Sequence, residues 1–145
     1  MKIIPWILIA VICYIVIKCL TVFINGRKYS FGNEMRQSSF SSEIFYTLLV
    51  TYIIVIIGFG LIYFILSFEG ILLIENGEVR EVSVLGSIIH SMYFSGVTML
   101  TIGYGDVTPI GFGRLIALIE ALIGYILPTA FVLRLVQNTR DNRDQ

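Results

Sequence analysis

The stretch that decides the fold of this chain is TIGYGD, residues 101–106. Gly103 and Gly105 can adopt a positive φ angle without the steric penalty of a Cβ atom. Their alternation with Ile102 and Tyr104 allows successive carbonyl groups to turn to one side, whereas in a β-strand they alternate. Aligned carbonyl oxygens can replace the water around a dehydrated cation when several copies face one another across an axis. One copy cannot surround an ion, so the stretch predicts an oligomer.

The segments on both sides of residues 101–106 fit the same interpretation. Residues 87–100 (SIIHSMYFSGVTML) are helix-like and mostly apolar, but they are shorter than the roughly 20 residues that cross a bilayer. They suit a helix that enters the membrane and turns back. A turn at residues 107–109 follows, and then a long apolar segment begins at Leu115. Residues 44–136 therefore resemble the pore of the potassium channel family, with an outer helix, pore helix, selectivity filter and inner helix.

The resemblance depends on a specific motif. From average residue frequencies, Thr-x-Gly-Tyr-Gly occurs by chance in roughly one chain in a thousand of this size. The alternative is a glycine-rich loop that only turns between helices. Non-helical backbone within a membrane is tolerated where it lines a cavity or is buried in protein, which favours the pore interpretation.

Composition indicates one integral membrane domain. The chain has 145 residues, 57% of them hydrophobic, and a mean hydropathy of +0.88. The formal net charge is zero, so there is no overall attraction to nucleic acid. Cys13 and Cys19 have no partners at metal-binding spacing and are expected to be lipid- or protein-facing apolar residues. No catalytic motif is found, and we expect no enzyme activity.

The first apolar segment has two interpretations. A lysine followed by a hydrophobic run is also found in secretory signal peptides. Here the run leads into Lys18 and Cys19 and not into a small-residue cleavage site, which favours a retained membrane helix.

The expected organisation of the chain follows from its apolar segments. It comprises an N-terminal transmembrane or membrane-embedded helix at 1–24, a cytoplasmic linker at 25–43, a pore domain at 44–136 (outer helix 44–68, extracellular loop 69–86, pore helix 87–100, filter 101–106, inner helix 114–136) and a cytoplasmic tail at 137–145 that is expected to be disordered. Within the outer helix, Gly58 and Gly60 allow close approach of a neighbouring helix or simply soften the helix. Asn76 and Gly77 in the extracellular loop predict a small hairpin turn.

Charges in the loops predict the orientation. The linker and the tail are basic and should be cytoplasmic, while the acidic loop at 69–86 should be outside. With three spans, the N-terminus is then outside and the C-terminus is cytoplasmic. We expect a multi-pass protein of the cell (plasma) membrane.

The resemblance assigns roles to the residues of the filter. K⁺ would be coordinated by carbonyl oxygens of Thr101, Ile102, Gly103 and Tyr104, with Gly105 completing the filter. The Thr101 hydroxyl would add the innermost ring. The Tyr104 ring would point into the surrounding wall of pore helices, and Thr98 is a candidate partner for its hydroxyl.

Asp106 matches the aspartate that follows the filter in this family, where it pairs with an aromatic donor on the pore helix. Tyr93 lies at the position of that donor and offers a hydroxyl. Some members also carry a carboxylate on the pore helix, and here Val97 occupies its place. An Asp106–Tyr93 hydrogen bond is therefore expected to support the filter alone.

The inner helix carries a predicted kink or gating hinge. Pro128 has no N–H and crowds the carbonyl of Gly124, which also matches the gating glycine of the family. A static kink that only shapes packing is the alternative. Glu120 is an intramembrane carboxylate that either faces the cavity or forms hydrogen bonds behind a pore helix. We favour the second position, because an intramembrane carboxylate without hydrogen bonds is costly in free energy. His90 is expected to be an interfacial side chain, with a pH sensor as the alternative.

We therefore expect an all-α membrane protein that assembles as a four-fold symmetric homotetramer in lipid and conducts K⁺ passively. No arginine-rich voltage-sensor helix is present, and the tail is too short for a ligand-binding cytoplasmic domain. A less selective cation channel and a non-conducting subunit of another transport system are the alternatives.

Overall fold

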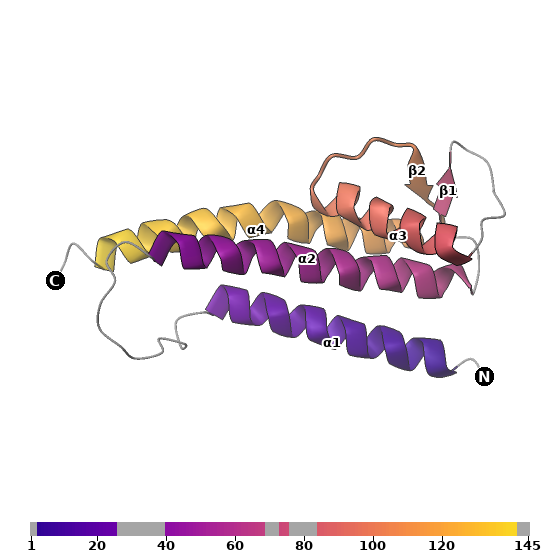
Figure 1. The fold of residues 1–145 in the computed structure, drawn as a ribbon, viewed down its shortest axis with the longest axis horizontal. Coiled ribbons are helices and arrows are strands. Elements are labelled where there is room, and N and C mark those ends of the chain that lie inside the picture. Colours follow the sequence, from indigo (N-terminus) through magenta and orange to yellow (C-terminus); the bar gives the residue numbers. More distant parts are fainter. Residues whose placement is uncertain (1–2, 26–39, 69–72, 76–83, 142–145) are drawn as a thin grey trace.

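A computed structural model describes residues 3–25, 40–68, 73–75 and 84–141 (Figure 1). The elements in chain order are α1 (Ile3–Asn25), α2 (Phe40–Ser67), β1 (Leu73–Glu75), α3 (Val84–Met99), β2 (Val107–Pro109) and α4 (Gly113–Asp141). Among the described residues, three helical segments are long and apolar enough to cross a membrane: Ile3–Phe23, Phe45–Ser67 and Gly113–Leu133. The predicted all-α membrane fold is confirmed.

The three long helices lie side by side, and α1 runs antiparallel to α2 (Figure 1). The shorter α3 packs against α2 and α4 at one end of this bundle, and the chain after it folds back to β2 at the same end. The N-terminal end of α1 lies at this end as well. Residues 101–106 thus form a re-entrant loop on the same side as the N-terminus.

Two glycines let α2 approach its neighbours closely. A Cβ built at Gly58 would lie 2.6 Å from Cγ2 of Val16 on α1, and one at Gly60 would lie 2.5 Å from Sδ of Met92 on α3. The two residues therefore serve opposite faces of α2, which confirms the close approach that their sequence predicts. The buried hydrophobic cluster around these contacts consists of Val16, Phe23, Val55, Phe59, Tyr63, Phe94, Met99, Val107 and Leu127.

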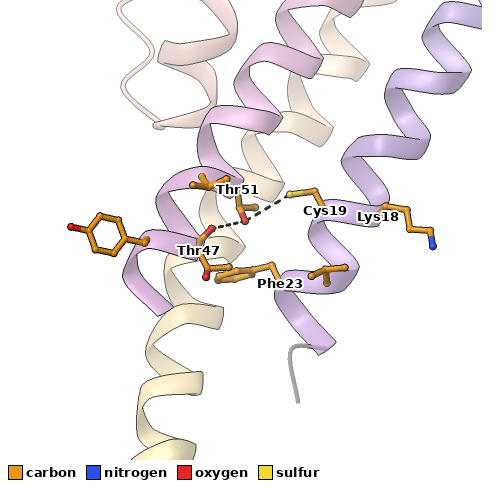
Figure 2. A pocket seen from close by; sticks show the side chains of 8 residues that line it. Lys18, Cys19, Phe23, Thr47 and Thr51 are labelled. Carbon is orange, nitrogen blue, oxygen red and sulfur yellow. Dashed lines mark hydrogen bonds between the residues drawn. The ribbon is translucent and has the colours of Figure 1, made fainter. Parts of the chain in front are cut away.

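The C-terminal half of α1 contacts α2 along an open apolar groove of about 470 Å³ (Figure 2). Cys19 and Phe23 point toward α2, while Lys18 points away and places its Nζ 5.7 Å from the ring centroid of Tyr14. The Cys19 thiol donates to Thr51 Oγ1 at 3.9 Å. Cys19 is thus a protein-facing residue and Cys13 is exposed. The groove is lined by Lys18, Cys19, Val22, Phe23, Tyr46, Thr47, Val50 and Thr51.

Several predicted boundaries are wrong by a few residues. The outer helix starts at Phe40 and not at 44, so the linker predicted at 25–43 ends earlier, and α3 spans Val84–Met99 and not 87–100. The inner helix continues to Asp141, which contradicts a disordered tail over 137–141, while 142–145 lie outside the described residues. The sequence boundaries follow the change from apolar to polar residues, but a helix continues into water until a glycine, a proline or a cap stops it.

The turn predicted at residues 107–109 is also wrong. These residues form β2, which pairs antiparallel with β1 in the register Leu73–Pro109, Ile74–Thr108 and Glu75–Val107. The strand β1 precedes α3 in the chain and β2 follows it, so no local sequence pattern predicts their pairing. The hairpin predicted at Asn76 and Gly77 lies outside the described residues.

Candidate functional site

The candidate site begins where α3 ends, and a single carbonyl fixes the chain that follows. The Thr101 N–H donates to the carbonyl of Thr98 at 3.0 Å, which tightens the last turn of the helix. The next two N–H groups, of Ile102 and Gly103, both donate to the carbonyl of Val97, at 2.9 Å and 3.2 Å. The start of the 101–106 loop is therefore held to the end of α3 by its backbone donors.

These two hydrogen bonds determine where the neighbouring carbonyl groups point. In a trans peptide the C=O lies opposite the N–H of the next residue, and none of the described peptide bonds is cis. The carbonyls of Thr101 and Ile102 therefore both point away from the Val97 oxygen. Two successive carbonyl groups are thus directed to the same side, as the sequence predicts.

The φ angles of the loop alternate in sign. They are positive at Thr101 (56°), Gly103 (57°) and Gly105 (79°), and the residues between them have no positive φ. The positive values at both glycines were predicted from their lack of a Cβ. The value at Thr101 was not predicted, because a β-branched residue rarely adopts this conformation and its sequence carries no signal for it.

The Tyr104 side chain is 70% exposed in the single chain. Among the described residues it forms no hydrogen bond with Thr98, whose backbone carbonyl is used by Thr101. A ring that packs into a wall of pore helices requires neighbouring subunits. The roles of Tyr104 and Thr98 therefore stay predictions.

Beyond the loop, Tyr93 on α3 donates its hydroxyl hydrogen to Asp106 Oδ2 at 2.8 Å. The predicted hydrogen bond is present, and it lowers the pKa of Asp106 below its ordinary value because it stabilises the carboxylate. The same bond raises the pKa of the Tyr93 hydroxyl. His90, three residues before Tyr93 on α3, also lowers the pKa of Asp106 through its charge. Val97 supplies no second carboxylate here.

Glu120 is completely buried and joins three helices. Its Oε2 accepts a hydrogen bond from the hydroxyl of Tyr63 on α2 at 2.8 Å, and its Oε1 lies 2.5 Å from the Ser95 hydroxyl on α3. The predicted hydrogen-bonding position behind α3 is confirmed. Tyr63 and Ser95 were not predicted as partners, although polar residues within apolar segments are a usable signal.

The two residues of the predicted hinge lie in α4, which continues through Pro128. Gly124 is buried, and a Cβ built on it would collide with the backbone carbonyl of Met99 at the end of α3. The glycine is therefore needed for the contact between α4 and α3. Whether α4 bends there stays a prediction. Tyr52 was not predicted to take part, yet its hydroxyl donates to the Gly124 carbonyl at 3.1 Å.

Comparison with known proteins identifies the family. Residues 51–141 match a family model described as "ion channel". The chain belongs to this ion channel family. The match begins within α2 and ends with α4, so it covers the loop and all three helices around it, whereas α1 lies outside it.

Two relatives of this ion channel are both called Protein LctB. The one from Bacillus caldotenax is 41% identical over 97 residues, which cover 66% of this chain and 72% of the relative. The one from Geobacillus stearothermophilus is 44% identical over 82 residues, covering 56% of this chain and 61% of the relative. No solved structure matches the chain. The family and the three apolar helices identify the chain as a multi-pass membrane protein.

Proposed function

We propose that this ion channel is a homotetramer that conducts K⁺ passively through a selectivity filter formed by residues 101–106. Each subunit contributes one row of carbonyl oxygens, and a four-fold axis converts four rows into a cage around a dehydrated ion. The transported ion is K⁺, and its ligands are the carbonyls of Thr101, Ile102, Gly103 and Tyr104. Gly105 completes the turn toward Asp106.

One observation carries this proposal. Both the Ile102 and the Gly103 N–H groups are directed to the carbonyl of Val97, so the carbonyls of Thr101 and Ile102 point together away from α3. A loop that only connects two helices does not require aligned carbonyl groups. The positive φ angles at Thr101, Gly103 and Gly105 favour continuation of the same row.

The helix arrangement also supports a pore. The C-terminal end of α3 carries the partial negative charge of the helix dipole, and four such ends would favour a cation inside the membrane. The N-terminal end of α1 lies at the same end of the bundle as the loop (Figure 1), which supports an N-terminus outside and a cytoplasmic C-terminus in the cell membrane. The remaining outer surface of the long helices is apolar and suits lipid.

The test is a flux measurement on purified protein in liposomes. We expect K⁺ and Rb⁺ uptake that exceeds Na⁺ uptake strongly and that Ba²⁺ blocks, together with a tetramer mass in lipid. Protein-free liposomes provide the background. Equal uptake of K⁺ and Na⁺ would favour the less selective cation channel. A monomer with Rb⁺ uptake at background would contradict the proposal and favour a non-conducting subunit.

A further inference from the structure

The inference starts from a backbone acceptor that the sequence of α4 leaves without its usual donor. In an α-helix, the carbonyl of Gly124 would accept a hydrogen bond from the N–H of residue 128. Pro128 has no N–H, so this bond cannot form. Gly124 is buried inside the bundle, where neither water nor lipid can supply a replacement. The carbonyl therefore needs a donor from another helix.

Tyr52 on α2 supplies that donor. Its hydroxyl lies 3.1 Å from the Gly124 carbonyl oxygen and joins residues that are 72 positions apart in the chain. The ring of Tyr52 packs against the hydrophobic cluster, so an apolar body carries the polar tip to the acceptor. The bond thus replaces the one that Pro128 removes.

The same glycine contacts the base of the 101–106 loop. There is no room for a Cβ between Gly124 and the backbone carbonyl of Met99, and Thr101 follows Met99 by two residues. One turn earlier in α4, Glu120 is bonded to Tyr63 and lies against Ser95. The part of α4 before Gly124 is therefore fastened to α2 and α3 by side chains. Bending would be confined to the segment that begins at Gly124.

We propose that the hydrogen bond from Tyr52 to the Gly124 carbonyl is a latch that holds the proline segment of α4 in the conformation seen here. When α4 bends at 124–128, the latch opens, and the contact of Gly124 with Met99 carries the movement to the 101–106 loop. Tyr52 is thus a positioning residue for gating. This inference rests on the proposed channel function.

A double-mutant cycle tests the latch, because Pro128→Ala restores the N–H that makes the Tyr52 hydroxyl redundant. In the wild-type background, Tyr52→Phe should change the ratio of open to closed time in single-channel recordings by roughly five- to thirtyfold, since it leaves a buried acceptor unpaired. In the Pro128→Ala background, the same substitution should change that ratio by less than about twofold. Tyr46→Phe is the matched control, because Tyr46 lies on the same helix and its side chain is 67% exposed.

The result that overturns the latch is an equal effect of Tyr52→Phe in both backgrounds, or no effect in either. Thermal unfolding in detergent gives a second measurement that requires no conduction. Tyr52→Phe should lower the unfolding midpoint in the wild-type background and leave it nearly unchanged with Pro128→Ala, whereas additive decreases would contradict the latch. If wild-type protein conducts no K⁺ while the unfolding cycle shows this coupling, the proposed function fails and the hydrogen bond between Tyr52 and Gly124 stands as a structural link only.

Discussion

At the scale of single residues, backbone conformation decides what the 101–106 loop can do. The loop has positive φ angles at both glycines, and a Cβ built at Gly103 meets no described atom within 4 Å. Space is therefore not the reason for the glycine. The reason is conformational, because an L-residue with a side chain is strained at this φ.

We expect Gly103→Ala to abolish selective flux while the protein still folds. Each subunit would be strained by about 1–2 kcal/mol in the loop conformation seen here, and the carbonyl row would relax out of alignment. Flux in liposomes and the unfolding midpoint measure the two effects separately. Gly96→Ala is the control, because Gly96 lies inside α3 with open space around it and no positive φ. Normal K⁺ selectivity in Gly103→Ala would contradict the prediction.

The Tyr93–Asp106 hydrogen bond predicts a pH dependence. Because the bond lowers the pKa of Asp106, its stabilising effect is fully present above the ordinary pKa of an aspartate and is lost as the pH falls through the lowered value. The bond also raises the pKa of Tyr93, so at high pH the effect is lost only above the ordinary pKa of tyrosine.

Tyr93→Phe should return the pKa of Asp106 toward its ordinary value. Acid should then inactivate flux at a higher pH than in the wild-type protein, and open lifetimes near neutral pH should shorten. A titration of flux against external pH measures the first effect, and single-channel recording measures the second. If Tyr93→Phe leaves unaltered both the open lifetimes and the pH at which acid inactivates flux, that result would count against a supporting role for this bond.

At the scale of helices, buried side-chain hydrogen bonds hold α4 in place. The Ser95 hydroxyl lies 2.8 Å from the Ile56 carbonyl and also within hydrogen-bond distance of Glu120 Oε1, but it has one hydrogen to donate. If Ser95 donates to Ile56, Glu120 completes the network by keeping its proton and donating to Ser95. A neutral carboxylic acid also avoids the cost of a buried charge.

This network predicts different results for two substitutions of Glu120. Glu120→Gln should keep nearly wild-type stability, because its amide donates to Ser95 and its carbonyl accepts from Tyr63. Glu120→Ala should cost about 2–5 kcal/mol, since it leaves a cavity and two buried hydroxyls with fewer partners. Unfolding midpoints in detergent measure both. A large loss of stability in Glu120→Gln would show that the charged form is required.

At the scale of the whole molecule, α1 is an addition to the ion channel unit. The family match begins in α2, and the loop, the Asp106 contact and the Glu120 network all come from α2, α3 and α4. The helix α1 covers one face of α2 through Val16 and Phe23, which are buried. Its main contacts within the described residues are with α2, the outer helix.

Deletion of residues 1–28 should therefore retain K⁺ flux and lower the unfolding midpoint. The face of α2 that α1 covers would then contact lipid. Lipid packs against a helix less closely than another helix does, so this face would lose packing. Flux and thermal unfolding, each compared with the full chain, provide the measurement. Loss of flux in a deletion variant that still folds and assembles would indicate that α1 contributes directly to the pore.

The sequence by itself determined the features that depend on local chemistry. The apolar runs predicted three spans because a bilayer excludes unpaired charge. The glycines of TIGYGD predicted carbonyl groups turned to one side, because only glycine adopts a positive φ at no steric cost. The Tyr93–Asp106 bond was predicted from the resemblance to a known family, with Tyr93 at the position of the aromatic donor. Helix ends were predicted less well, because hydropathy marks the edge of the membrane and not the end of a helix.

Only the tertiary structure decided the features that depend on distant parts of the chain. These are the pairing of β1 with β2, the partners of Glu120 and the donor from Tyr52 to Gly124. The sequence showed that Pro128 removes a donor and that Glu120 needs partners inside the membrane, but it could not say which helix supplies them. That choice depends on how the helices pack, because a buried polar group takes whichever complementary group the packing brings within reach.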